Sequence, residues 1–410
     1  MKKTTTSPSR SQFAVFRQIS NLIPTHLVPK LARETGVDKK ARTFSPWSHL
    51  VSLIYAQLTH AIGLNDVCDA LGLQSGLLVS LRAATPPSRN NLSHANKERD
   101  ASLAEKIFWA VLGHLQNLQP GFARGRRGKG VARRFRRAIH VVDSTTIQLI
   151  ASCMDWAKHR RRKAAAKCHL RLDLHSFLPR FAIIDTAREN DAIRSRELCA
   201  AIRAGEIVVF DKAYLDFVHL FDLLQRGVFW VTRAKENLAF ELIGELPVST
   251  PNILRDQLIV LSTAVAAKTY PEVLRRIVAL VEIDGRAQEM VFLTNNLEWS
   301  PASVADLYRC RWSIEAFFKQ IKQTLQLSDF LGHNANAVRW QVWTALLVYV
   351  LLRFLAFVHG WNHSFTRLFT LVRSSLWRRW DLPGLLQSYG TATGSFRFIA
   401  TPQQPCLTGF

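Results

Sequence analysis

The order of apolar and polar positions along the chain predicts helices first, then alternating strands and helices. From residue 13 to about residue 119, apolar residues recur at helical spacing between Gly, Pro and Asp breaks. Residues 138–142 and 207–210 are short apolar runs rich in β-branched residues, and helical segments follow at 192–203 and 214–225. This pattern predicts an α/β fold, in which a mixed sheet carries helices on its faces and a helical N-terminal domain precedes it.

The pattern changes again after residue 235. Between 236 and 296, short β-like runs are separated by polar or Pro-containing turns, which indicates a β-rich insertion. Ser300-Pro301 is typical of a helix start, and the absence of Gly and Pro up to Lys322 predicts one continuous helix. We therefore expect regions at 1–123 (helical), 124–235 with 297–360 (the core), 236–296 (the insertion) and 361–410 (a basic C-terminal region).

An apolar stretch near the C-terminal end of the core resembles a membrane span in composition. Arg353 interrupts it, and the uninterrupted run from Val342 to Leu352 is too short to cross a bilayer. We therefore expect a buried core helix and no membrane partner. The basic N-terminus is not followed by an apolar run, so no secretory signal is expected. The Gly-, Thr- and Pro-containing end of the chain is expected to be poorly ordered.

The charge balance of the chain indicates the kind of partner that it binds. Of 410 residues, 54 are Lys or Arg and 31 are Asp or Glu, which gives a net charge of +23. Such an excess favours a polyanionic partner, most often nucleic acid. Two basic runs, 124–137 and 158–163, flank the apolar run at 138–142 and are typical of an approach for phosphates. The glycine spacing within 124–137 fits neither nucleotide-binding fingerprint, so no nucleotide cofactor is expected.

Six scattered cysteines carry no CxxC pair and no spacing typical of a disulfide framework or a zinc site. They favour free thiols in a reducing cytoplasm.

Two apolar strands each end in an aspartate, Asp143 and Asp211. If the strands are neighbours, both carboxylates lie at one sheet edge and are suited to hard divalent cations. Glu315, on the helix packed against the sheet, would be the third ligand. An aspartate at a strand end is also common as a turn former or helix cap. Rival carboxylates in the same region are Asp173, Asp185, Glu189 and Asp191.

The predicted helix after residue 301 carries a mixed-charge face. Tyr308, Arg311, Glu315 and Lys322 are spaced at offsets of 3, 7 and 14 residues. At about 100° per residue they fall within an arc of roughly 60°. On spacing alone, an amphipathic helix with an ordinary solvated, mixed-charge face is the commoner interpretation.

These residues carry a resemblance to a known family. The series Tyr308-x2-Arg311-x3-Glu315-x6-Lys322 is similar to the "YREK" signature of the insertion-sequence-four family of bacterial DDE transposases. Residues 141–145 (VVDST) resemble the first-aspartate strand of that family and residues 210–214 (FDKAY) its second-aspartate motif. Residues 230–235 (WVTRAK) resemble the next strand with its basic residues, Arg233 and Lys235. The resemblance covers about residues 135–360.

The resemblance implies a ribonuclease-H-like core interrupted by the β-rich insertion. It implies hydrolysis at transposon ends followed by attack of the freed 3′-hydroxyl on target DNA. It also implies that Asp143, Asp211 and Glu315 bind two Mg²⁺ (or Mn²⁺) ions.

The implied partners are the double-stranded DNA of transposon ends and target. Tyr308, Arg311 and Lys322 would hold phosphates near the cleaved end, with Arg233 and Lys235 as further DNA contacts. Pairing two ends implies a dimer on DNA, and the implied location is the bacterial cytoplasm, at the nucleoid. The helical N-terminal domain on a basic protein favours a DNA-binding module, and a helical subdomain used only for packing or dimerisation is the alternative.

Three alternatives stay open at this point. The first is a ribonuclease-H-like nuclease or resolvase without strand transfer. The second is a non-catalytic DNA-binding protein that retains the fold. The third is a recombinase with Tyr308 as nucleophile, for which no supporting Arg/His set is found. Trp299 is a candidate for stacking on a flipped base, with ordinary core packing as the alternative.

Overall fold

The computed structural model describes residues 8–39, 43–125, 134–149, 153, 158–160, 163–186, 191–283, 285–325 and 330–388. Contacts within the chain divide it into two compact units. The helical unit comprises Met1–Ala123, Ile147–Ala166 and Lys319–Ile399. The sheet unit comprises Arg124–Thr146, Lys167–Phe318 and Ala400–Phe410. Each unit is described by itself.

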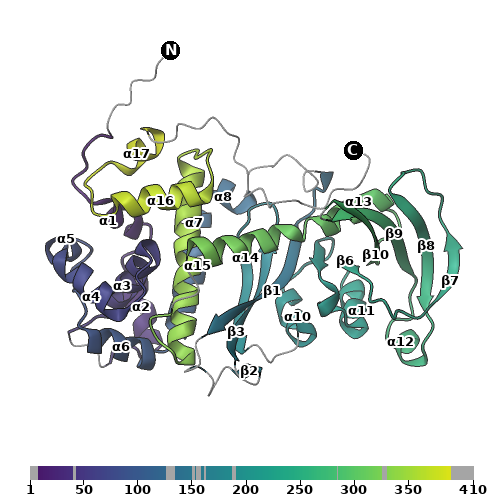
Figure 1. Ribbon diagram of the computed structural model, residues 1–410, viewed down its shortest axis with the longest axis horizontal. Coiled ribbons are helices and arrows are strands. Elements are labelled where there is room, and N and C mark those ends of the chain that lie inside the picture. Colours follow the sequence, from purple (N-terminus) through teal and green to yellow (C-terminus); the bar gives the residue numbers. More distant parts are fainter. Residues whose placement is uncertain are drawn as a thin grey trace, which may run out of the picture. The chain divides into compact units, whose positions relative to one another are not determined.

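The helical unit is built around two buried helices, α3 and α15 (Figure 1). Ser45 caps α3 by accepting a hydrogen bond from the Ser48 backbone N–H, and Pro46 occupies its first turn. α15 packs against α3, α6 and α7. The described helices are α1 (Val15–Ser20), α2 (Leu27–Glu34), α3 (Pro46–Thr59), α4 (Leu64–Leu73), α5 (Ser75–Val79), α6 (Arg89–Glu98), α7 (Ser102–Leu118), α8 (Pro120–Arg124), α15 (Ala335–Val358), α16 (Phe365–Ser375) and α17 (Leu382–Ser388).

α15 is the apolar helix that the sequence singled out. Within the described part of the chain it is the one helix long and apolar enough to cross a membrane. Most of it is buried inside the helical unit, from Ala337 to Ala356. The prediction of a buried core helix is confirmed.

The described strands form a large mixed sheet in the order β2-β3-β1-β5-β6-β10-β9-β8-β7, with β4 paired to β3. β1, β5 and β6 are parallel, whereas β10 runs antiparallel to β6 and to β9. The mixed α/β architecture is therefore as expected. The strands are β1 (Ile139–Leu149), β2 (Lys158–Arg160), β3 (Lys163–Asp173), β4 (Pro179–Thr186), β5 (Ile207–Phe210), β6 (Phe229–Arg233), β7 (Phe240–Glu245), β8 (Ile253–Leu261), β9 (Leu274–Ile283) and β10 (Arg286–Thr294).

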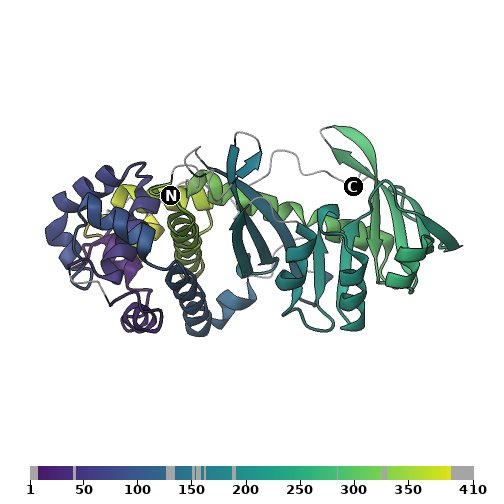
Figure 2. The same ribbon diagram turned by 90° about the horizontal axis from the view of Figure 1, so that it is seen from below.

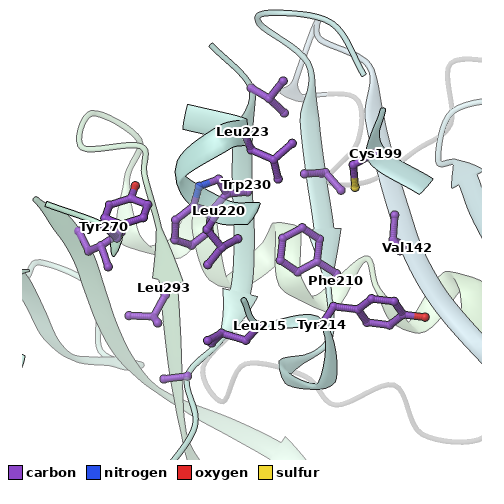
Figure 3. Close-up of a cluster of buried hydrophobic side chains, with 14 of the residues drawn as sticks. Val142, Cys199, Phe210, Tyr214, Leu215, Leu220, Leu223, Trp230, Tyr270 and Leu293 are labelled. Atoms are coloured by element: carbon purple, nitrogen blue, oxygen red, sulfur yellow. The ribbon is translucent and has the colours of Figure 1, made fainter. Parts of the chain in front are cut away.

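One face of the parallel strands packs on the helices that connect them (Figures 1 and 3). Val142, Phe210 and Trp230 lie in a buried cluster with Cys199 of α10 (Asp191–Cys199) and Leu220 of α11 (Phe217–Gln225). Figure 3 shows these side chains converging between strands and helices. This apolar core fixes the register of β1, β5 and β6 because a one-residue slip would turn each buried side chain to the other face.

The opposite face of the same strands receives α13 (Pro301–Arg309), which contacts β5, β6 and β10. In Figure 2, α13 (green) lies on one side of the teal strands, and α10 and α11 (teal) lie on the other. Side chains alternate along a strand, so a residue next to Val142 or Phe210 points toward α13. This alternation positions the candidate site. The remaining described helices are η3 (Lys212–Tyr214), α12 (Ala264–Thr269) and α14 (Trp312–Thr324).

A buried ion pair joins β9 to β8, and its arginine also bonds the loop that precedes α13. Arg275 of β9 donates from Nε and Nη2 to the carboxylate oxygens of Asp256 of β8, at 2.7 and 2.6 Å. The two side chains are 4% and 1% exposed. Arg275 Nη1 also donates to the backbone oxygens of Leu297 and Trp299.

The predicted helix from 301 to 322 is wrong in one respect, because it is interrupted. α13 ends at Arg309, Cys310 and Arg311 form a turn, and α14 begins at Trp312. Several backbone N–H groups at this point donate three residues back, as from Arg311 to Tyr308 at 2.9 Å. This tighter winding rotates the residues after it. Tyr308, Arg311 and Glu315 nevertheless lie together, since the Arg311 guanidinium is 5.6 Å from the Tyr308 ring centroid and its Nη1 is 2.6 Å from Glu315 Oε1.

Two further expectations differ from the structure. β1 does not end at Asp143 but continues to Leu149, and it is the pairing with β5 that ends at Val142. The range 297–360, expected within the core, is divided after Phe318, because α15 packs on helices of the helical unit.

Parts of the two basic runs, at 126–133, 161 and 162, lie outside the described residues. So does the C-terminal end from 389 to 410. α16 and α17 occupy the earlier part of the C-terminal region.

Candidate active site

Asp143 and Asp211 occupy equivalent positions on two adjacent parallel strands. Val141 pairs with Val209 and Val142 with Phe210, and each aspartate is the next residue. Asp143 Oδ1 accepts a hydrogen bond from the Ser144 backbone N–H at 2.8 Å. Asp211 Oδ1 accepts one from the Lys212 backbone N–H at 2.8 Å and caps η3. The buried register of β1 and β5 thus sets the two carboxylates side by side on the face that receives α13.

Tyr308 connects α13 to the two aspartates. Its side chain is 4% exposed, and its ring packs against Phe292 of β10 with the centroids 5.0 Å apart. Its hydroxyl donates to Asp211 Oδ1 at 3.2 Å. Burial raises the pKa of Tyr308 to about 12, with Arg311 lowering it and Asp211 raising it further. Tyr308 is therefore a neutral hydrogen-bond donor at physiological pH.

Arg311 links the first aspartate to the glutamate. From the turn between α13 and α14, its Nη1 lies 3.1 Å from Asp143 Oδ2 and 2.6 Å from Glu315 Oε1. Its side chain is 11% exposed, that of Asp143 14% and that of Glu315 39%. The local tightening of the helix brings Arg311 between the two carboxylates, so one guanidinium nitrogen serves both.

The surroundings of Asp143 and Arg311 shift the pKa of both groups. Burial raises the pKa of Asp143 to about 6, Arg311 opposes that rise, and Glu315 and Asp211 add to it. For Arg311, burial alone would lower the pKa, but Tyr308, Glu315, Asp143 and Asp211 raise it above its usual value. Arg311 therefore carries its charge at any relevant pH, and Asp143 is mainly ionised at neutral pH.

The donor set suits a hard divalent ion, since every candidate ligand is a carboxylate oxygen. Among the residues that the structure describes, however, no group of three or more Asp, Glu, His or Cys side chains is arranged to hold a metal. In the described arrangement, Arg311 lies between Asp143 and Glu315 where a shared cation would be expected. Its Nε is buried without a hydrogen-bond partner among the described residues. The three carboxylates thus have the chemistry of a metal site. In the structure the Arg311 guanidinium balances the charge of Asp143 and Glu315.

The other predicted site residues have different surroundings. Arg233, at the end of β6, is half-buried and close enough to Tyr308 to lower its pKa. Lys235 is exposed, and its Nζ lies 3.5 Å from the Leu215 backbone oxygen. Lys322 lies on the part of α14 that belongs to the helical unit.

Lys212 was not singled out, although it follows Asp211 directly. Its Nζ lies 3.7 Å from Glu236 Oε1, and its side chain is 40% exposed. With Arg233 and Lys235 it adds a third cation at the ends of β5 and β6. Its position in the motif Phe210-Asp211-Lys212 was the signal available in the sequence.

Trp299 lies in an aromatic cluster. Its ring centroid is 5.1 Å from that of Phe229 and 5.4 Å from that of Phe135. All three side chains are partly exposed, so the contacts alone do not decide between packing and stacking, and the role of Trp299 stays a prediction.

Comparisons with known proteins agree with the motifs. The model of the family "Transposase DDE domain" matches residues 134–351, more than half of the chain. A "Domain of unknown function (DUF4372)" matches residues 11–81. A protein of Sinorhizobium fredii assigned as a transposase, y4zB, is 30% identical over 304 residues, which cover 73% of this chain and 80% of that protein.

Two further relatives come from named insertion sequences. The Escherichia coli transposase InsG of element IS4 is 24% identical, over 45% of this chain and 42% of its own length. A Geobacillus stearothermophilus protein assigned as the transposase of IS5377 is 28% identical, over 54% of this chain and 58% of its own length.

One solved structure, the piggyBac transposase synaptic complex with hairpin DNA, aligns over 93% of this chain and 80% of that chain. Its TM-score of 0.45 and identity of 8% are too low to support an argument. The family match and the relatives are sufficient without it. The chain belongs to the DDE transposases of insertion sequences, and it is an enzyme that acts as a DNA transposase.

Proposed function

We propose that Asp143, Asp211 and Glu315 hold two Mg²⁺ or Mn²⁺ ions, with which this transposase cuts the ends of its element and joins the freed 3′-hydroxyl to target DNA. The observation that carries the proposal is the register of the two aspartates on parallel strands, with Glu315 tied to Asp143 through Arg311. When bound, such ions activate the attacking oxygen and stabilise the leaving oxygen of a phosphodiester.

The strand order supports a ribonuclease-H-like core as part of this proposal. β4, β3, β1, β5 and β6 follow one another in the sheet, and the last three are parallel. The strands from β7 to β10 lie in sequence between the second aspartate and Glu315, as the resemblance implies for the β-rich insertion.

The protein's own cations act on the DNA backbone in this proposal. For Asp143 and Glu315 both to become ligands, Arg311 has to move from between them, and a phosphate is a suitable new acceptor for a guanidinium. Tyr308 stays as a neutral donor at Asp211. Arg233, Lys235 and Lys212 line the ends of β5 and β6 and hold neighbouring phosphates.

A tyrosine nucleophile is not favoured. Tyr308 is buried, its pKa is raised to about 12, and its hydroxyl donates to Asp211. A nucleophile that forms a covalent link to DNA needs access and an activating base. The nuclease without strand transfer remains the second candidate, since it would use the same carboxylates.

The proposed partners are double-stranded DNA at the transposon ends and at the target. Two ends require two sites, so a dimer on DNA is part of the proposal, as is DNA binding by the N-terminal helices. No nucleotide cofactor and no membrane partner are included. The proposed location is the bacterial cytoplasm, at the nucleoid.

A strand-transfer assay tests the proposed function. The full chain is incubated with Mg²⁺, a labelled duplex of a pre-cleaved transposon end and a supercoiled plasmid. We expect the label to appear in plasmid-sized products, and a matched duplex that ends in a 3′-dideoxynucleotide to give none. Cutting of intact ends without any joining would favour the nuclease.

Lys322→Ala tests the proposed phosphate contact on α14. We expect weaker binding of the end duplex, with the slope of log K against log salt concentration reduced by about 1. Fluorescence anisotropy over a series of salt concentrations measures it. Lys319→Ala removes the same charge from an exposed position on the same helix and serves as the control. An unchanged slope would make Lys322 a structural residue.

A further inference from the structure

One helix of the helical unit, α6, exposes a face of polar and basic side chains. On α6, Leu92, Ala95 and Asn96 are buried. At about 100° per residue, the outer face spans an arc of roughly 140°. It carries exposed Arg89, Asn90, Ser93, His94 and Lys97. We call these five residues the α6 polar face.

The α6 polar face has the chemistry of a major-groove reader. Arg and Lys pair with guanine, Asn pairs with adenine through two hydrogen bonds, and Ser pairs with either. Exposed Glu98 lies just outside the arc, at about 180° from Arg89, and its Oε1 is 3.6 Å from Nζ of Lys97 in a surface ion pair. Ten residues give a helix about 15 Å long, which suits a groove about 12 Å wide.

The inner side of α6 is held firmly. The Asn96 side chain lies 2.8 Å from His49 Nε2 of α3, in buried surroundings. Asn336 Nδ2 of α15 donates to the Asn96 backbone oxygen at 2.9 Å, and Trp340 Nε1 donates to the Arg99 backbone oxygen at 2.7 Å. A reading helix needs such support, because base contacts demand a fixed register.

A cavity lies beside α6. A cavity of about 470 Å³ opens between α6 and the preceding chain, with Asn91, His94 and Glu98 on one side and Lys39 on the other. A helix that enters a groove needs space for the DNA strand at its flank. Lys39 is exposed there and suited to a phosphate.

Neighbouring helices lack this combination. The exposed side of α4 carries Asn65 with two carboxylates, Asp66 and Asp69. The exposed side of α2 carries the cations Lys30 and Arg33 without an amide or hydroxyl that reads bases. Of α2, α4 and α6, α6 therefore has the exposed face that best combines cations with side chains that pair with bases.

We propose that α6 enters the major groove of the terminal inverted repeat and reads its sequence through the α6 polar face. The proposal rests on the proposed function, because it names the surface by which the transposase selects its own ends. Asn90 contacts base edges, and Lys97 contacts a phosphate at the rim of the groove.

The test compares two duplexes by fluorescence anisotropy with the full chain. One carries the inverted repeat that brackets the gene, and the other is a scrambled duplex of equal length and composition. Asn90→Ala should reduce the preference for the repeat by about tenfold or more without a change in salt slope. Lys97→Ala should weaken both duplexes and reduce the slope by about 1.

Matched controls come from the neighbouring helices. Asn65→Ala on α4 and Lys30→Ala on α2 make the same exchanges at exposed positions, and we expect them to leave the preference unchanged. An Asn90→Ala protein with the preference of the wild type, or an equal loss in Asn65→Ala, would overturn the proposal.

Strand transfer by the wild-type protein separates the two proposals. If the wild type joins ends and prefers the repeat, and Asn90→Ala keeps the same preference, only the proposed role of α6 is wrong. If the wild type joins nothing, the proposed function fails first.

Discussion

Glu315→Gln should abolish DNA cleavage and leave the affinity for transposon ends within about twofold. The exchange keeps the size of the side chain but removes one carboxylate from the proposed metal site and one partner from Arg311. Because metal activation supplies several kcal/mol of transition-state stabilisation, we expect cleavage to fall by about a thousandfold or more. Gel assays of end cleavage in Mg²⁺ and anisotropy with an end duplex measure the two quantities.

The matched control is Glu289→Gln, the same exchange at an exposed position of β10. It should cleave like the wild type. Cleavage by Glu315→Gln at the control rate would remove Glu315 from the site and leave Asp143 and Asp211 without their proposed third partner.

Arg275→Met should lower the free energy of unfolding of the sheet unit by about 3–5 kcal/mol, because it leaves the charge of Asp256 buried without its partner. The pair is almost fully enclosed, and Arg275 also bonds the loop that leads into α13. Calorimetry of the full chain should show the transition of the sheet unit at a lower temperature. A chain with two units need not unfold in one step, so the transitions are fitted separately.

Two variants make this result interpretable. Arg255→Met changes an exposed arginine next to Asp256 and should cost less than about 1 kcal/mol. The double variant Asp256→Leu/Arg275→Met removes both charges and should recover much of the loss. A single variant as stable as Arg255→Met would show that the buried pair contributes little.

The parts of the site that follow from local pattern were predictable. Apolar runs with β-branched residues predicted β1 and β5, and the aspartates next to them stand out in the sequence alone. Their adjacency needed the pairing of β1 with β5, because residues that lie far apart in sequence meet only through register.

The arrangement around Arg311 was not predictable from periodicity. A count of about 100° per residue assumes an unbroken α-helix, and the backbone bonds near Cys310 follow the tighter i to i−3 pattern. Arg311 was expected beside Glu315, but its second partner, Asp143, is 168 residues away. The helical wheel carries no information about a partner on another strand.

Because α15 holds α6 by hydrogen bonds, α6 gains its support only late in the synthesis of the chain. Asn336 bonds to a residue 240 positions earlier in the chain, so the helical unit closes only when α15 has left the ribosome. Glu315 precedes α15 by a short distance in sequence. A nascent chain therefore completes its proposed cutting site shortly before the support of its proposed reading helix, and a chain that terminates before Glu315 has neither.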